Sequence, residues 1–336
     1  MKKIAFLAAV AATLCTVACN KGLDTPVNEV PTQNVEQELH PLTIKVKGNA
    51  PETKATNIDP DDEVKVNTLQ VLAFRNNVKD TYGTISNSDE ITIQCGDGNR
   101  VVYAIVNGPD VSSINTPTDL LATMCTMDVT SISNFAMVGS QPVDLPASDA
   151  VEIEVTRLAS RVVVKKITRD FTVASEGAKT MNICGIYLGD AAIKNNLGGT
   201  YVPTLAADFE FRNCVFSTTP DARALGGLFA QFALADDSSY STPHYFYTFP
   251  NPTVNDSASA TWGARHTHLI IQVLVDNLTK YYNIPLPVLE RNKSYEIDEI
   301  TLTRLGASDP KNYLQDTDFE ISVKDWTVVP VADPTY

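Results

Sequence analysis

The chain has 336 residues, 43% of them hydrophobic and 20% charged, so it is long enough for about two domains and can bury a core. Its 40 acidic residues outnumber its 26 lysines and arginines, which gives a net charge of −14. This balance argues against a nucleic-acid partner, because phosphates are bound by basic patches.

The N-terminus has the pattern of an export signal. Lys2 and Lys3 precede an apolar run, Ile4 to Val17, that is too short to span a membrane comfortably. Ala18 and Cys19 end the signal in the manner of a lipoprotein, with cleavage after Ala18 and a lipid such as palmitate on Cys19. An ordinary secretory signal cut after Ala18 is the alternative, and both interpretations export the chain. No later apolar stretch is long enough to span a membrane, so only the lipid would anchor the protein.

An amphipathic strand follows a polar tether. Residues 20–38 show no hydrophobic periodicity and are typical of a flexible linker. Leu42, Ile44 and Val46 then alternate with polar residues. Because side chains in a strand point alternately to opposite faces, this segment is predicted to be a strand with one apolar face.

A second tether follows this strand. Residues 48–63 are loose in pattern, contain the basic residue Lys54, and end in the acidic run 59–63. The acidic run lacks the spacing and the glycine of an EF-hand. It is therefore interpreted as a solvated turn and not as a calcium site.

From Val64 onward the sequence predicts short strands separated by loops rich in Gly, Pro, Asn, Asp and Ser. The predicted strands are 64–74, 91–93, 101–106, 151–155, 161–167, 183–188, 245–249, 269–275, 281–284 and 295–302. Thr116, Pro117 and Asp119 are a helix-start signal, and the helix is expected to run to about Cys125. Residues 220–226 are a second helix candidate.

This pattern predicts an all-β fold class, with two β-sandwich domains in tandem and one or two short helices. Arg157 lies between two predicted strands and is a natural seam between the domains.

The chain ends, as it begins, with an amphipathic strand on a tether. Phe319, Ile321 and Val323 alternate with polar residues, and Trp326 and Val328 extend the apolar face. Such a strand needs a sheet edge and an apolar groove. Adding a strand to a neighbouring subunit is a known way of joining subunits.

No motif for catalysis, metal or cofactor binding stands out. His266 and His268 would share one face of a strand, but no cysteine or acid stands at ligand spacing, and two surface imidazoles are the simpler interpretation. Gly96 and Gly98 resemble half of a phosphate loop, which a hairpin turn explains better. A glycosidase-type pair of carboxylates stays open, as does sugar binding by the aromatic residues in 245–249. We expect no enzyme activity and no cofactor or metal.

Four cysteines remain after the signal and the lipid site: Cys95, Cys125, Cys184 and Cys214. In an oxidising compartment they allow three disulfide pairings, and buried thiols are an equal alternative.

Several short stretches, spread over nearly the whole chain, share the order of motifs of one protein family. They are Ala18–Lys21, Leu42–Val46 with Glu52–Ala55, Asn99–Asn107, Ala136–Gly139, Glu154–Arg157, Arg291–Tyr295 and Val323–Val328. Together they resemble the Bacteroidales fimbrillins, the FimA- and Mfa-type pilin subunits. In the same order, the stretches are similar to that family's lipoprotein signal, first strand with protease site, central strand, M-x-G turn, domain seam, R-N-x-x-Y hairpin and closing strand.

The resemblance implies transthyretin-like sandwiches and a route to a fibre. The precursor would be an outer-membrane lipoprotein whose first strand is removed by a surface protease that cuts between Lys54 and Ala55. The emptied groove would accept the terminal strand, as donor, of another subunit. The implied segments are signal 1–18, lipidated tether and removable strand 19–54, N-terminal sandwich 55–155, C-terminal sandwich 156–305, and tether with donor strand 306–336.

The implied partners are other copies of the chain, related fimbrial subunits, outer-membrane lipid through Cys19, and an adhesion ligand on host or bacterial cells. A stalk subunit is the leading interpretation. A tip or anchor subunit, a monomeric carbohydrate-binding surface lipoprotein and a secreted β-sandwich hydrolase are the alternatives.

Overall fold

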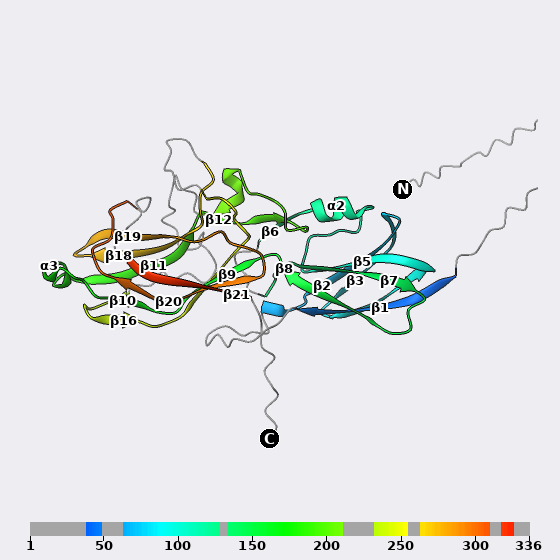
Figure 1. Cartoon of the computed structure of the whole chain (residues 1–336), viewed down its shortest axis with the longest axis horizontal. Coiled ribbons are helices and arrows are strands. Elements are labelled where there is room, and N and C mark those ends of the chain that lie inside the picture. The colour runs from blue at the N-terminus through cyan, green and yellow to red at the C-terminus, as the bar shows by residue number, and fades with distance from the viewer. Residues whose placement is uncertain are drawn as a thin grey trace, which may run out of the picture. The chain divides into compact units, whose positions relative to one another are not determined.

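The computed structural model describes residues 38–48, 63–127, 133–210, 232–254, 263–309 and 317–325, the last of these by its backbone alone. The described residues all belong to one compact unit. The described part is built from β-strands, with the short α-helices α2 (Pro117–Ala122) and α3 (Ala174–Gly177), the 3-10 turn η1 (Ala206–Asp208), and a helical conformation at Glu63 and Val64. The predicted all-β class is confirmed (Figure 1).

The strands fall into two sets along the sequence. The first set is β1 (Leu39–Gly48), β2 (Thr68–Arg75), β3 (Val78–Ser86), β4 (Glu90–Gly96), β5 (Gly98–Val106), β6 (Met124–Thr126), β7 (Met137–Leu145) and β8 (Val151–Arg157). The second set is β9 (Ser160–Val164), β10 (Ile167–Arg169), β11 (Met181–Gly189), β12 (Ala191–Ala192), β13 (Lys194–Asn196), β14 (Phe209–Glu210), β15 (Phe232–Ala233), β16 (Ser238–Tyr240), β17 (His244–Thr248), β18 (His268–Val275), β19 (Leu278–Pro285), β20 (Lys293–Leu302) and β21 (Thr317–Asp325).

Seven strands of the first set form a sheet in the order β3-β2-β5-β7-β8-β1-β4, and the eighth, β6, pairs with β13 of the second set. The two ends of this order meet, because a Cβ atom at Gly83 of β3 would lie only 2.4 Å from the Cγ2 atom of Ile93 in β4. The sheet therefore folds back on itself and encloses one apolar core, to which β1, β2, β4, β5, β7 and β8 all contribute buried side chains.

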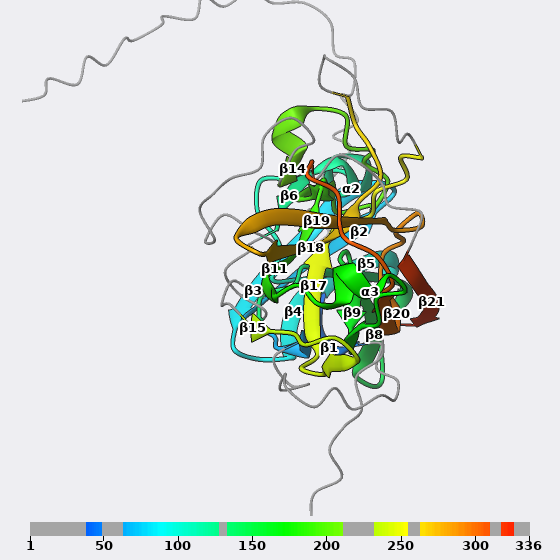
Figure 2. The same ribbon diagram turned by 90° about the vertical axis from the view of Figure 1, so that its left-hand side faces the viewer.

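Most strands of the second set form two facing layers (Figure 2), whereas β12 pairs with β14 and β13 with β6 outside them. One layer is a sheet in the order β16-β10-β20-β9-β17. In it β9 and β10 pair with successive parts of one edge of β20, and β21 pairs with the opposite edge. The second layer is the sheet β15-β11-β18-β19. The core between them is lined by side chains such as Ile297 and Ile300 of β20 and Ile271 and Val273 of β18. This arrangement is the sandwich that the sequence predicts for this half of the chain.

A third apolar cluster contains residues from both sets of strands. Phe74 and Ile105 come from the first set, and Tyr245, Tyr247 and Phe249 from β17 and its end. The two sets thus share a buried core in addition to their own.

Two tight hairpin turns explain the register of two long antiparallel pairs, β2–β3 and β18–β19. Asn76 and Asn77 join β2 to β3, and Asp276 and Asn277 join β18 to β19, and all four residues have positive φ. Asn and Asp tolerate this left-handed conformation, and a two-residue turn of this kind matches the twist of paired strands.

The predicted helix is present but shorter than expected. The Thr116 side chain accepts a hydrogen bond from the Asp119 backbone N–H at 3.1 Å, and Pro117 opens the helix, as predicted. The helix ends at Ala122, so the expected end near Cys125 is wrong. Residues 124–126 form β6 and pair with β13, and this tertiary pairing overrides the local helix pattern. The helix candidate 220–226 lies outside the described residues.

Two glycine interpretations are also corrected. Gly96 and Gly98 do not form a hairpin turn, because β4 and β5 are not neighbours in the sheet; Gly98 has a φ of 90° where the chain bends from one strand to the other. Gly139 lies inside strand β7 and not in a turn. A Cβ atom there would lie 2.1 Å from the carbonyl oxygen of Glu154, so only glycine allows β8 to approach this closely.

Candidate functional site

The first strand, β1, is an interior strand of the first sheet. It pairs antiparallel with β4, where Leu42 is opposite Ile93, and parallel with β8, where Val46 is opposite Ile153. Its backbone therefore supplies a hydrogen-bonding neighbour to two strands that do not pair with each other. Without β1, both of these strands would present an unpaired edge.

The inward face of β1 is fully engaged in the core, as the alternating pattern predicts. Leu42 and Ile44 are 0% exposed and Val46 is 5% exposed. They pack in the cluster that also holds Ile91 of β4 and Ile153 of β8. All three predicted first-strand residues are thus brought together in one apolar groove between β4 and β8.

The outward face of β1 is basic, and the rim of the groove is acidic. Lys45 is opposite Glu90 in β4 and Glu152 in β8, and Lys47 is opposite Glu154. The Lys47 Nζ atom lies 3.3 Å from a carboxylate oxygen of Glu152, and both side chains are exposed. Exposed ion pairs add little to the free energy of folding. Charge complementarity of this kind acts mainly on the register in which two strands pair.

Cys95 lies at the end of the groove. It is opposite His40 in the β1–β4 pairing, is buried in the same core, and has a thiol whose pKa is raised to about 11 by burial. Cys125, in the cluster shared by the two sets of strands, has its pKa raised to about 11 by burial as well. The third described cysteine, Cys184, is also a thiol and donates to the backbone oxygen of Gln272.

The chain re-enters the structure after the second tether at Glu63, which is held tightly. A carboxylate oxygen of Glu63 lies 3.0 Å from Nη1 of Arg161, and Tyr247 donates a 2.7 Å hydrogen bond to the other oxygen. Arg157 donates to the Glu63 backbone oxygen, and burial lowers the pKa of Arg157 to about 10. The interpretation of residues 59–63 as a solvated turn is therefore wrong for Glu63, which is only 3% exposed.

These contacts hold Glu63, the first described residue after β1, against the second set of strands. Sequence reasoning missed Glu63 because its partners, Arg161 and Tyr247, lie about 100 and 180 residues further along the chain. The only available signal was an arginine at the seam, Arg157, which the structure places beside Glu63.

The terminal strand, β21, is paired as an added strand on the edge of β20. Figure 1 shows β21 alongside β20. The pairing is antiparallel, with Val323 opposite Tyr295 and Ile321 opposite Ile297, and the register shifts between Ile297 and Ile300. Of the predicted donor residues, Phe319, Ile321 and Val323 lie in β21. The structure brings this strand to a sheet of the second set and not to the groove of β1.

Several predicted site residues lie outside the described residues. They are Cys19, Lys54, Ala55, Trp326 and Val328. Their proposed roles in lipidation, processing and strand donation stay predictions.

The two histidines are not the surface pair that was expected. His268 is only 1% exposed, because it begins β18, an interior strand, and its Nδ1 atom lies 3.5 Å from Asp190. A ring nitrogen of His266 lies 2.8 Å from the backbone oxygen of Leu286. Within the described ranges, no group of three or more His, Cys, Asp and Glu side chains could hold a metal ion.

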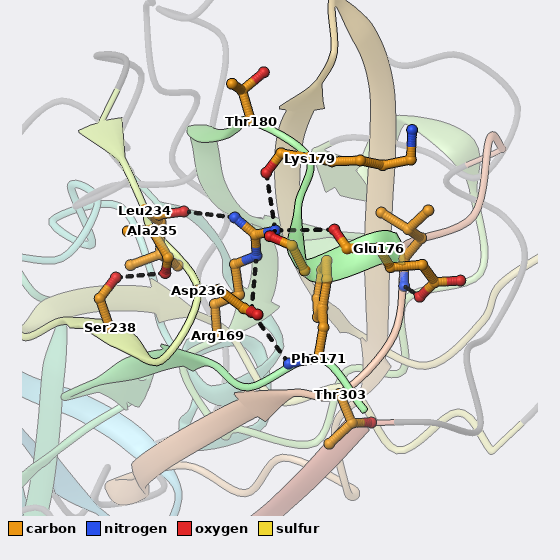
Figure 3. Close-up of polar contacts among 12 residues, drawn as sticks. Arg169, Phe171, Glu176, Lys179, Thr180, Leu234, Ala235, Asp236, Ser238 and Thr303 are labelled. Atoms are coloured by element: carbon orange, nitrogen blue, oxygen red, sulfur yellow. Dashed lines mark hydrogen bonds and ion pairs between the residues drawn. The ribbon is translucent and has the colours of Figure 1, made fainter. Parts of the chain in front are cut away.

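A second buried polar cluster surrounds Arg169 at the end of β10 (Figure 3). Its guanidinium donates to the backbone oxygens of Leu234, Glu176, Gly177 and Lys179, lies 3.4 Å from a carboxylate oxygen of Asp236, and stacks 4.6 Å from the ring centre of Phe171. Because these donors are used to hold α3 and the loop after β15, we interpret this cluster as structural.

Over the described part of the chain, no helix is both long and apolar enough to cross a membrane.

No protein-family profile and no curated protein matches the sequence. Solved structures do match. The fimbrilin FimA from Porphyromonas gingivalis superposes with a TM-score of 0.59 at 14% identity, covering 87% of this chain and 98% of that one. A candidate cell adhesion protein from Bacteroides eggerthii has a TM-score of 0.59 at 20% identity, again covering 87% and 98%. Another from Parabacteroides distasonis has a TM-score of 0.56 at 17% identity, covering 86% and 99%. At these identities the likeness establishes the shared fold.

Proposed function

We propose that this chain, which has the fold of a solved fimbrilin, is a structural subunit of a cell-surface fimbria. In this proposal it is exported as a lipoprotein precursor, loses its first strand by cleavage after Lys54, and polymerises by donating its terminal strand to another subunit. The segments 1–18, 19–54, 55–155, 156–305 and 306–336 are its signal, removable part, two sandwiches and donor tail.

The observation that carries the proposal is the position of β1. It is an interior strand with a fully buried apolar face, yet in the sequence residues 49–62, with Lys54 as their one basic residue, separate it from the next strands. A single cut in that segment would detach a strand that the sheet needs on both sides.

The energetics favour refilling the groove after such a cut. Burying each of Leu42, Ile44 and Val46 is worth roughly 1.5–3 kcal/mol, and each ladder hydrogen bond adds about 0.5–1.5 kcal/mol. An emptied groove would forfeit these terms and leave two sheet edges open, which is a template for another strand. A second subunit that supplies an apolar strand would recover them and dissociate very slowly.

The test is the N-terminal sequence and the intact mass of the protein recovered from the surface of cells that produce it. The proposal expects a chain that starts at Ala55 and runs as a ladder in SDS without heating. A chain that starts at a lipidated Cys19 and forms no ladder would contradict it, and would indicate an anchor or a monomeric surface lipoprotein.

Substitution at the cut site makes this test specific. Lys54→Ala is expected to leave the precursor folded but uncut and monomeric, because a protease that cleaves after a basic residue would find none in residues 49–62. Lys54→Arg is the matched control and is expected to retain the ladder. A ladder from the alanine variant equal to that of the wild type would overturn the proposed route.

A further inference from the structure

We propose that the terminal strand of a second copy of this chain enters the groove in the same direction and register as β1, with Lys324 at the position of Lys47. This inference rests on the proposed function and specifies how the two subunits join. It is drawn from the groove that surrounds β1 and from the sequences of the two strands.

The two strands have the same pattern. Residues 42–48 read LTIKVKG and residues 319–325 read FEISVKD, so Ile, Val and Lys recur at equivalent positions. Aligned in this way, Phe319, Ile321 and Val323 take the positions of Leu42, Ile44 and Val46. The alignment thus puts three apolar residues at the three positions of the groove that are almost completely shielded from solvent.

The acidic rim distinguishes this alignment from the others. Glu90, Glu152 and Glu154 surround the positions of Lys45 and Lys47. In the proposed register Ser322 and Lys324 take these two positions, so the one cation of the terminal strand meets the acids. Glu320 takes the position of Thr43, whose neighbour in β4 is the uncharged Thr92.

A strand entering in the opposite direction would meet repulsion. With Ile321 kept at the position of Ile44, Glu320 would stand at the position of Lys45 and Asp318 at that of Lys47. Two carboxylates would then face the three glutamates of the rim, and like charges directly opposite one another in a sheet are destabilising.

Registers slipped by two residues are also unfavourable. A slip in one direction puts Asp325 at the position of Val46, which is 5% exposed, and burying an unpaired carboxylate is costly. A slip in the other direction puts Glu320 between Glu90 and Glu152. In the proposed register Asp325 instead takes the position of Gly48, where an added Cβ atom would make an ordinary 3.6 Å contact with Val64.

Engineered disulfides test the register directly. The hydroxyl oxygens of Thr43 and Thr92 are 2.9 Å apart and exposed, so cysteines at these two strand positions would be close enough to bond. The register places Glu320 where Thr43 is. The full chain carrying Glu320→Cys and Thr92→Cys, produced in cells that process it and then mildly oxidised, is expected to give a ladder that survives boiling and disappears with reductant.

The matched control is Ser322→Cys with Thr92→Cys. That pair would be opposite each other in the reversed strand and in the slipped register that buries Asp325, so it is expected not to cross-link. Each cysteine alone reports background bonding through the native cysteines. A boiling-resistant ladder from the control pair would overturn the proposed register. The absence of such a ladder from both pairs would overturn it as well.

The two proposals fail in different ways. If wild-type protein gives no ladder in unheated SDS, the proposed function itself fails. If the unheated ladder forms but the Glu320→Cys pair does not cross-link, polymerisation stands and only the register is wrong.

Charge reversal tests the role of the rim. Lys324→Glu is expected to slow assembly at low salt by about two- to fivefold, the range corresponding to an exposed ion pair. Adding Glu152→Lys to the same chain is expected to restore part of the rate, because donor and acceptor charges are exchanged together. Equal rates for wild type and both variants would contradict a selecting role for Lys324.

Discussion

Glu63 is a single residue that anchors the first described segment after β1 to the fold. Its buried carboxylate accepts hydrogen bonds from Arg161 and Tyr247. Its backbone oxygen accepts one from Arg157. A sequence of four acids in five residues predicts a solvated segment, and this prediction fails where one acid meets a buried cation that is distant in the sequence. Local composition carries no information about such a partner.

We expect Glu63→Gln to destabilise the protein by about 3–5 kcal/mol, because removing one member of a buried ion pair leaves the other charge uncompensated. The measurement is urea unfolding at pH 7. Glu90→Gln, at an exposed carboxylate on the same half of the chain, is the control and should change stability by less than about 0.5 kcal/mol. An equal effect of the two substitutions would show that the buried pair has no special importance.

At the scale of single elements, β1 was the easiest strand to predict and the most informative. Its three apolar residues alternate strictly, and they are the residues that the structure buries. Strands β3 and β7 had no such signal. The first is mostly polar and at the end of the sheet order, and the second is interrupted by Gly139 and Pro142. The sequence did not predict that β4 and β8 flank β1. Pairing between strands that are distant in the sequence depends on how all strands of the sheet are arranged.

Cys95 should report whether β1 is in place. In the intact chain its labelling by a thiol reagent at pH 7.5 is expected to be slow, because it is buried and its pKa of about 11 leaves almost no thiolate. Below pH 11 the rate should rise with pH, whereas an exposed cysteine levels off near pH 9. Departure of β1 exposes one wall of the Cys95 site and should accelerate its labelling by at least about tenfold, since each unit of pKa change alters the thiolate fraction tenfold.

Cys125 is the internal control for this measurement. Its pKa is also raised to about 11, but it lies in the cluster shared by the two sets of strands and not beside β1. Mass spectrometry of labelled peptides should show a change at Cys95 alone. Equal acceleration at both thiols would indicate general loosening and not the opening of a groove.

The terminal strand makes a different prediction, because β21 is an added edge strand on β20, which also pairs with β9 and β10. A chain truncated after residue 316 is expected to fold, to be processed, and to accept a donor strand without offering one. Mixed with wild-type subunits at a ratio of about one to ten, it should shorten fibres seen by electron microscopy. Fibres of unchanged length would indicate that the donor lies elsewhere in the chain.

For the whole molecule, the dominant physical quantity is its charge. The full chain has a net charge of −14, and residues 55–336 alone hold 20 basic and 35 acidic residues, so subunits repel one another at long range, although the contact proposed here pairs a lysine with the acidic rim. We expect fibre growth to be faster at 150 mM salt than at 10 mM, because the screening length falls from about 30 Å to about 8 Å. Light scattering would follow this, with sucrose at equal osmolarity as control. Slower growth in salt would show that local attraction at the rim governs the encounter.

The fold class and the sandwich layers followed from strand patterns spread over the chain, but the core shared by the two sets of strands did not. Tyr247 and Phe249 have the pattern of ordinary alternating strand residues, and nothing in their sequence indicates that they share a buried cluster with Phe74 from the other set. Contacts between distant segments of this kind depend on the shapes of both surfaces.

Only residues 49–62 connect Gly48 to Glu63, and this short connection determines what the proposed cut would do to the equilibrium between strand and groove. While residues 49–62 connect strand and groove, a strand that opens momentarily remains at an effective local concentration of the order of millimolar and closes again. Once the connection is cut, the detached strand is diluted into the surroundings, and its return becomes a rare bimolecular event. Proteolysis would then make assembly proceed in one direction without any nucleotide or ion gradient. The reason is that dilution makes the dissociation of the cleaved first strand effectively irreversible.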